Sequence, residues 1–584
     1  MTIHEEVAQL ISFSAVVDLN PLEHPAAGEE LARRVVRTFT LYPQHMAGPA
    51  ALADFIRAVR QYVPQPLFNI DQEGGRLENA PWLTSSPGNM ALGAVAQGDR
   101  ATAARLARAI GEVAGRELRA LGIRWNFAPV GDVNINPANP VIGTRSFGED
   151  PAIAAELVTA YTQGLQAAGV AATVKHYPGH GDTDRDSHTG LPMIPHSLER
   201  LMAVELVPFQ MAARAGAEAV MTAHIAFPWL DRKPATMSSM LLSQVLRSHG
   251  PVTLKVDGHD VTVPGLGFDG VIITDALEMG AIIRQFGVGE AAVQAIEAGA
   301  DMVITGVDAP SINELWQECF GRAYTAADQW AAYDAILAAV QSGRISRERL
   351  AASVARVTRL LQRYPIELNG SSPEAHIRTP EHLAVAQAIA DQAVTVVRAE
   401  PGIGLQRVPA SETILVVYPP FERLTPADNS FNDVLQLDAT LRAHHPNVQA
   451  VFVLPPEGPD HVEALRRRRP GVMVAPDMQA MLDVARKASR IVVATYFAQH
   501  SPFQTEVVEA LLRTHKPVIV VAMGNPYDLA AFPEVQNYLA TYSVRGPSCT
   551  AAAKILFGQL RPTGRLPVSI PALASRGTGL TESL

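Results

Sequence analysis

The sequence predicts an α/β protein in which a (β/α)8 TIM-type barrel is followed by a doubly wound α/β sandwich domain. Three observations support this fold class. Short runs rich in Val, Ile and Phe alternate with helical patterns through residues 1–365, as expected where strands are buried on both faces of a parallel sheet. A polar stretch then interrupts the pattern, and a second alternation follows it. The chain, with 584 residues of which 47% are apolar, is long enough for both cores.

Eight apolar runs in the first part of the chain are predicted to be buried strands. In chain order they are residues 9–14, 35–41, 66–70, 123–130, 170–176, 219–225, 270–276 and 300–306. Helical patterns lie between most of them, and the clearest cover 101–122 and 151–169. Asp150 and Pro151 suit the cap and first turn of the second helix. Eight strands with interleaved helices fit a barrel.

A polar stretch with prolines at 369–382 is typical of a linker. We therefore expect a catalytic barrel domain at 1–365, a linker at 366–385 and a C-terminal α/β sandwich domain at 386–584. Five apolar runs predict the strands of the second domain, with helices between them. They cover residues 412–420, 448–456, 490–497, 516–524 and 537–543.

One insertion departs from the barrel pattern. Residues 252–263 alternate around Asp257-Gly258, a strong signal for a β-hairpin with a two-residue turn. The insertion precedes the seventh predicted strand, so it should project from the face opposite a barrel's active site. A contact or oligomerisation role and a merely decorative loop are both open.

Charge and composition limit the kinds of partner that the protein can bind and the cellular compartment in which it is expected. Net charge is 48 − 58 = −10, which disfavours nucleic acid or an anionic membrane as the main partner. Two cysteines far apart argue against a disulfide framework. Glu5 and Glu6 stand where a signal peptide would carry basic residues, and no apolar run reaches the ~20 residues needed to span a bilayer. We expect a cytoplasmic protein, with export by another route left open.

Polar residues repeatedly follow the predicted barrel strands at their carboxyl ends, the face where barrel active sites are assembled. A scatter of polar residues would not be expected to choose the same end each time. These residues are Asp71, Asp132, Asn134, Arg145, Lys175, His176, His224 and Asp275.

Asp275 closes the seventh predicted strand, in IITDALEMG. A carboxylate presented there can attack an anomeric carbon and form a glycosyl ester. Alternatively, Asp275 caps a helix that begins directly after it, because Asp is a favoured N-cap residue.

The stretch KHYPGHGDTDRDSH, residues 175–188, is dense in histidine and aspartate. Asp186 can orient the ring of His188, which then exchanges protons as acid and base. A solvated polar loop is the alternative. A metal site is a third interpretation, since the stretch supplies N and O ligands, although no fixed metal-ligand signature such as His-Glu-x-x-His is present.

Several blocks together resemble the β-N-acetylglucosaminidases of glycoside hydrolase family 3. They are DQEGGR, NPVIGTRSFGEDP, KHYPGHGDTDRDSHTGLP, VMTAHIAFP, PATMS and GFDGVIITDALEM, in the family's order. The resemblance covers residues 1–365. The second domain matches more loosely, through its size, its doubly wound pattern and a terminal PTGRLPVSIP, and resembles the C-terminal domain of two-domain members.

This resemblance implies roles for seven residues. Asp275 would be the nucleophile, His188 the general acid/base and Asp186 its orienting partner. The positions that would bind the hydroxyls of the non-reducing sugar are Asp71, Arg145, Lys175 and His176. The family uses no metal or other cofactor. One departure is Asn79, where many single-domain relatives carry an arginine that helps bind the sugar.

The expected activity is that of a retaining exo-β-N-acetylglucosaminidase acting on peptidoglycan- or chitin-derived GlcNAc. Its expected partner is a small carbohydrate substrate, and neither nucleic acid nor membrane. Imidazole becomes neutral after losing its proton, so it would not repel an anionic acceptor as a carboxylate would. Phosphate could therefore replace water, and a glycoside phosphorylase is the nearest alternative. A β-glucosidase, a non-catalytic sugar-binding protein and a metal-dependent hydrolase are further alternatives. The oligomeric state is not predicted.

Overall fold

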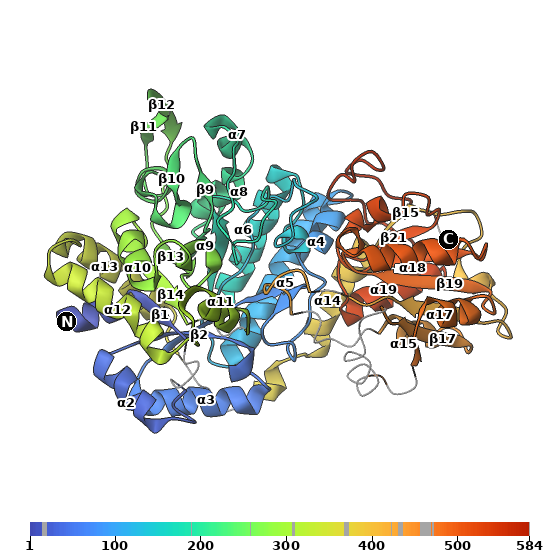
Figure 1. Cartoon of the computed structure of the whole chain (residues 1–584), viewed down its shortest axis with the longest axis horizontal. Helices are drawn as coiled ribbons and strands as arrows, with labels where there is room; N and C mark the ends of the chain where they lie inside the picture. The colour runs from blue at the N-terminus through green and yellow to red at the C-terminus, as the bar shows by residue number, and fades with distance from the viewer. Residues whose placement is uncertain are drawn as a thin grey trace.

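The computed structural model has two bodies side by side, a barrel that carries the N-terminus and a sheet domain that carries the C-terminus (Figure 1). It describes residues 1–14, 20–188, 190–256, 258–306, 310–366, 373–421, 423–429, 436–455, 469, 472–582 and 584.

All eight predicted barrel strands are present, and they form a closed parallel barrel. Each strand pairs with its neighbours in chain order, and the last pairs with the first. The strands are β1 (Ile11–Phe13), β2 (Thr38–Leu41), β3 (Leu67–Ile70), β6 (Trp125–Asn126), β7 (Ala171–Tyr177), β8 (Ala219–Thr222), β13 (Val271–Ala276) and β14 (Met302–Thr305). Their side chains are almost all buried, which explains why the runs are apolar throughout rather than alternating.

Helices surround the barrel. The two clearest predictions correspond to α5 (Arg100–Ala120) and α6 (Pro151–Ala167). Asp150 caps α6 as expected, because its side chain accepts hydrogen bonds from the backbone N–H groups of Ala152 and Ile153. The other helices are α1 (Ile3–Ala8), α2 (Pro25–Arg34), α3 (Pro49–Tyr62), α4 (Asn89–Ala96), α7 (Leu198–Ala203), α8 (Leu206–Arg214), α9 (Gly280–Ile283), α10 (Val288–Ala298), α11 (Pro310–Phe320), α12 (Ala326–Gln341) and α13 (Arg347–Arg363).

The second body is a seven-stranded mixed sheet with the order β15-β21-β20-β19-β16-β17-β18. The five predicted strands are β16 (Ile414–Tyr418), β17 (Val448–Val453), β19 (Arg490–Thr495), β20 (Val518–Ala522) and β21 (Tyr538–Ala540). Two edge strands escaped prediction, β15 (Thr395–Arg398), which is antiparallel to β21, and β18 (Met473–Ala475). Among the described residues of this body the helices are α15 (Leu437–Arg442), α17 (Met478–Ala485), α18 (Pro502–Leu512) and α19 (Gly546–Leu556).

Helix α14 (Pro380–Ala393) joins the two bodies and packs against α4 and α5 of the barrel and α19 of the sheet domain. Its His382 lies 2.8 Å from the buried carboxylate of Glu117 on α5. The predicted linker, 366–385, overlaps the start of α14, and residues 367–372 of it lie outside the described part of the chain. The bounds of the three predicted segments therefore stay predictions.

The sheet domain docks on the barrel through the crevice where its strand order reverses. From β16 the chain continues to β17 on one side of the sheet, and from β19 it continues to β20 on the other side, so the strand order reverses between the neighbours β16 and β19. Doubly wound sheets bind ligands at such a switch point. Here the crevice holds a barrel side chain, Arg76 of the DQEGGR loop. Its Nε donates to Asp428 after β16 at 2.9 Å, and its guanidinium lies 4.4 Å from the centroid of the Phe497 ring after β19. The second domain is thus anchored beside the carboxyl ends of the barrel strands.

The predicted hairpin is present as β11 (Pro251–Val256) and β12 (His259–Pro264), paired antiparallel. It projects from the barrel on the side away from the sheet domain (Figure 1). Gly258 has φ +82°, as the turn requires, and Asp257 lies outside the described residues. A contact or oligomerisation role stays untested.

Among the described residues, no helix combines the length and the apolar character that crossing a membrane would require.

Candidate active site

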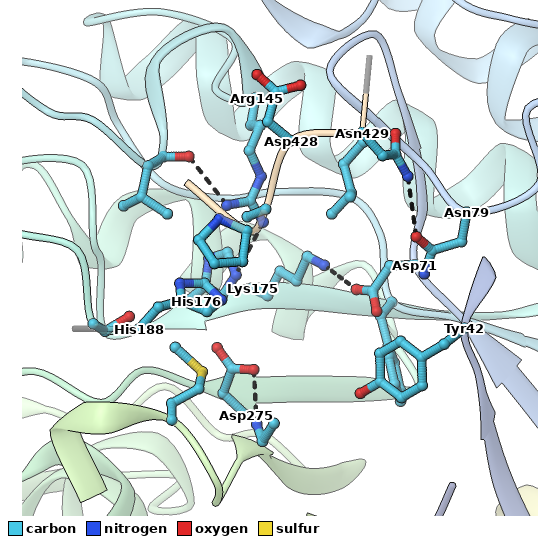
Figure 2. A pocket seen from close by; sticks show the side chains of 18 of the residues that line it. Tyr42, Asp71, Asn79, Arg145, Lys175, His176, His188, Asp275, Asp428 and Asn429 are labelled. Carbon is cyan, nitrogen blue, oxygen red and sulfur yellow. Dashed lines mark hydrogen bonds and ion pairs between the residues drawn. The ribbon is translucent and has the colours of Figure 1, made fainter. Parts of the chain in front are cut away.

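A cavity of about 390 Å³ opens at the carboxyl ends of the barrel strands. Six of the seven predicted site residues line it: Asp71, Arg145, Lys175, His176, His188 and Asp275. Their arrangement around the cavity is drawn in Figure 2. The seventh, Asp186, lies behind His188. The floor is apolar, because Phe127, Met221 and Ile304 belong to the upper layer of the barrel core.

One wall of the cavity is a buried network of charges. Lys175 Nζ donates to Asp71 at 2.5 Å and lies 2.6 Å from Glu73. Arg145 binds Glu73 with two parallel bonds of 2.9 and 2.8 Å. Burial raises the pKa of Glu73, but the charges of Arg145 and Lys175 outweigh it and hold that pKa well below its usual range. Glu73 is therefore an anion that fixes both cations, which leaves Asp71 at the cavity surface with an exposed fraction of 19%.

His176 is held by Asp132, a residue predicted to lie at this face. Its Nδ1 lies 2.7 Å from Asp132 Oδ2, and Asp132 also accepts from the backbone N–H of His180 at 2.6 Å. Burial lowers the pKa of His180 to about 4. Asp132 thus orients the start of the 175–188 stretch, while Asn134 instead donates to Tyr527 of the sheet domain at 3.1 Å.

Asp275 lies in β13 and faces the cavity, and it does not cap a helix. The following helix, α9, begins at Gly280 with Met279 as its N-cap residue, so the alternative interpretation of Asp275 is wrong. Its Oδ1 accepts from the backbone N–H of Ala276 at 2.8 Å. Burial raises the pKa of Asp275, but neighbouring histidines and that hydrogen bond outweigh it, so the pKa is lowered. A carboxylate kept ionised in an apolar floor suits a nucleophile.

His188 and Asp186 form the expected pair. Nδ1 of His188 lies 2.6 Å from Oδ1 of Asp186, which also accepts from the backbone N–H of His188 at 2.9 Å. Burial lowers the pKa of His188, but the charges of Asp186 and Asp275 outweigh it and raise the pKa above its ordinary value. The bond to Asp186 occupies Nδ1, so Nε2 is the nitrogen available for proton transfer.

Comparisons with known proteins identify the family of the chain. Residues 2–360 match the Glycosyl hydrolase family 3 N terminal domain, and residues 494–581 match the Glycosyl hydrolase family 3 C-terminal domain. The chain belongs to glycosyl hydrolase family 3. A solved family 3 β-N-acetylglucosaminidase from Paenibacillus sp. str. FPU-7 is 35% identical with a TM-score of 0.80, and the match covers 98% of this chain and 99% of that one.

Two further matches place this family 3 chain among its relatives. Beta-hexosaminidase A of Pseudoalteromonas piscicida is 29% identical over 592 residues, covering 94% of this chain and 91% of that protein. A solved β-glucoside phosphorylase, at 21% identity, shares the fold with a TM-score of 0.72, over 98% of this chain and 94% of that one. The predicted family and fold class are confirmed, and the chain is a glycoside hydrolase.

The side chains of the 175–188 stretch that could bind a metal ion in this family 3 enzyme are bonded to separate partners. His180 bonds to Thr183 and Ser187, and Asp182 bonds to His196. Among the described residues, no three His, Cys, Asp or Glu side chains gather as ligands of one metal ion would. The stretch is organised as a set of hydrogen-bonded pairs, and part of it is buried, unlike a solvated loop.

Residues of the second domain complete the cavity, and sequence reasoning did not assign them to it. The segment after β16 contributes Arg423, Pro426, Ala427, Asp428 and Asn429 to the lining. Asn429 donates to Asn79 at 3.2 Å (Figure 2). No motif marks this segment, because its role follows only from how the domains dock. Glu73 was also missed as an organiser of the cations, although it stands inside DQEGGR.

Proposed function

We propose that this family 3 enzyme is a retaining exo-β-N-acetylglucosaminidase that removes terminal β-linked GlcNAc from peptidoglycan- or chitin-derived saccharides. The observation that carries the proposal is the pairing of Asp275 with His188 across one cavity. Their surroundings shift the two pKa values in opposite directions: the pKa of the Asp275 carboxyl is lowered, and that of the His188 imidazole is raised. Such divergence separates the roles of nucleophile and acid.

The proposed reaction has two displacements. The Asp275 carboxylate attacks the anomeric carbon while His188 Nε2–H gives its proton to the leaving oxygen, which breaks the glycosidic bond and forms a glycosyl ester. Water then attacks the ester, His188 takes the proton of that water, and the sugar leaves with its β configuration retained. Asp71, Arg145, Lys175 and His176 are proposed to bind the hydroxyls of the terminal sugar, since hydrogen bonds to charged groups contribute about 1.5–3 kcal/mol each.

The relatives support the sugar as well as the chemistry. The Paenibacillus protein is a β-N-acetylglucosaminidase, and its match extends over nearly the whole of both chains. A cytoplasmic location stays a prediction.

A phosphorylase is the second candidate, and the observation that favours it is the histidine itself. After the first displacement His188 is neutral, so it does not repel an anionic acceptor as a carboxylate would. Phosphate would then attack the ester in place of water and yield a sugar 1-phosphate.

One experiment separates these candidates. The enzyme is given p-nitrophenyl β-N-acetylglucosaminide or the β-glucoside, with and without phosphate, and products are followed by NMR. We expect β-GlcNAc as the first product, at a rate that phosphate does not change. GlcNAc 1-phosphate would establish the phosphorylase, faster cleavage of the β-glucoside would establish a glucosidase, and binding without turnover of either would support a sugar-binding protein.

A further inference from the structure

The cavity is bounded on one side by a segment of the second domain, residues 423–429, which leaves β16 and crosses toward the DQEGGR loop of the barrel. Asn429 and Asn79 face one another there, one from each domain (Figure 2). Both line the cavity, and Asn79 is only 5% exposed. A donor of this pair that has no protein partner is therefore available to a ligand in the cavity.

The backbone sets how the two amides are turned. The N–H of Glu78 donates to Asn429 Oδ1 at 2.9 Å, and an N–H can only donate, so the oxygen of Asn429 must face it. The nitrogen of Asn429 therefore faces Asn79, where it donates to Oδ1 at 3.2 Å. A third bond, from Asn429 N to the carbonyl oxygen of Arg76 at 3.2 Å, fixes the backbone.

This arrangement leaves donors without acceptors. Nδ2 of Asn79 donates to no group in the described part of the chain, and Asn429 Nδ2 keeps a second hydrogen. The pair lies beside Asp71, because Asn79 N donates to the carbonyl oxygen of Asp71 at 3.2 Å. A hydroxyl group is both donor and acceptor, so one that donates to the Asp71 carboxylate can accept from Asn79.

We propose that the Asn79–Asn429 pair is a sugar-binding element built across the two domains, in which Asn429 sets the orientation of Asn79 and the pair donates to a hydroxyl oxygen of the terminal sugar. The second domain is then part of the subsite, and Asn429 is a specificity-determining residue. The inference rests on the proposed function, since it takes the ligand to be a terminal sugar residue bound beside Asp71.

The test compares full-length wild type with Asn429→Ala on an aryl β-GlcNAc and on its 3-, 4- and 6-deoxy analogues. On the parent substrate we expect KM to rise about tenfold with kcat nearly unchanged, the size of one lost neutral hydrogen bond. On one deoxy analogue the wild type should lose the same factor and the variant should lose no more, because both changes remove the same bond.

Two further variants separate binding from folding. Asn429→Asp keeps the shape and the acceptor for Glu78 N–H but removes the Nδ2 donor, so it should reproduce the rise in KM. Its Tm is measured first, because the new carboxylate adjoins Asp428, and the kinetics are compared well below that Tm. Ser569→Ala removes another interdomain bond, 2.8 Å from its Oγ to Glu149, away from the cavity lining. We expect that control to have the wild-type KM.

An unchanged KM in both Asn429 variants would overturn the inference, and so would equal losses on all deoxy analogues or the same loss in Ser569→Ala. Turnover by the wild type is measured first and tests the proposed function separately. If the wild type hydrolyses nothing, the same variants are compared by calorimetric titration with GlcNAc. Equal affinities of the variants and the wild type would then refute the role of the pair.

Discussion

Arg76→Met should destabilise the docked arrangement of the two domains. Arg76 and Asp428 are 1% and 0% exposed, and removing one partner of a buried ion pair costs about 3–5 kcal/mol because the other charge stays buried. Asp428 keeps the hydroxyl of Tyr496 at 2.6 Å, and a hydrogen bond to a charged group is worth about 1.5–3 kcal/mol. We therefore expect the low end of the range, about 3 kcal/mol, or roughly a hundredfold in the docking equilibrium.

Urea unfolding followed by two signals measures this effect. All five tryptophans, at positions 82, 125, 229, 316 and 330, lie in the barrel, so fluorescence reports the barrel while far-UV circular dichroism reports both bodies. In Arg76→Met the midpoint should fall and the two transitions should separate, because docking couples the domains. Urea is preferred to guanidinium, whose ionic strength would screen exposed ion pairs such as the one used below as a control.

A matched control uses an exposed pair. Arg344 and Glu290 are 41% and 44% exposed, so Arg344→Met should cost no more than about 1 kcal/mol. Arg76→Met combined with Asp428→Asn should recover much of the loss, since no uncompensated charge then remains. If Arg76→Met costs as little as the exposed control, and its transitions stay coincident, the reasoning about the buried anchor is refuted.

Three predictions concern catalysis. Asp275→Ala should lower kcat for an aryl β-GlcNAc at least about a thousandfold. Azide should restore part of the activity, because it can attack the anomeric carbon in place of the missing carboxylate and form the α-glycosyl azide. Near-normal activity without azide would contradict the role of Asp275. His188 must be protonated to act, and its pKa is raised, so kcat/KM should fall as pH rises through that pKa, and Asp186→Asn should move this limb to lower pH; an unmoved limb in a pH–rate profile would show that another group titrates. Glu73→Gln removes the anion that holds Arg145, so KM should rise more than tenfold while Glu73→Asp rescues part of it, and an unchanged KM would mean that the cations hold their positions alone.

Most of the fold was predictable because its strands are buried on both faces. Such strands read as continuous apolar runs, which is why all eight barrel strands and five of the sheet domain were found. β15 and β18 were missed although strands as short as they are were found. β15 starts directly after the Val394 cap of α14, so its apolar residues continue those of the helix. β18 begins with an exposed Met473 and an only partly buried Val474, so it is not a fully buried run.

The site was predictable where one strand end carries the chemistry, and not where two domains meet. Asp71, Lys175, His176 and Asp275 follow strands whose carboxyl ends meet at one face. Asn429 lies 350 positions from Asn79 in the chain, and only the docking of the domains brings the two together. The cap interpretation of Asp275 failed for a related reason, because the helix after β13 starts four residues further on than the sequence suggested.

In this chain the ligand-binding crevice of the second domain is filled by a side chain of the first domain, Arg76. Arg76 belongs to the same chain as the crevice, so its binding there does not depend on the concentration of a dissolved ligand. Its guanidinium and the Asp428 carboxylate are buried, so a dissolved cation would have to enter a site closed to solvent in order to replace it. A substitution at Arg76 should therefore change two properties together, the contact between the domains and the position of Asp428, which lines the cavity.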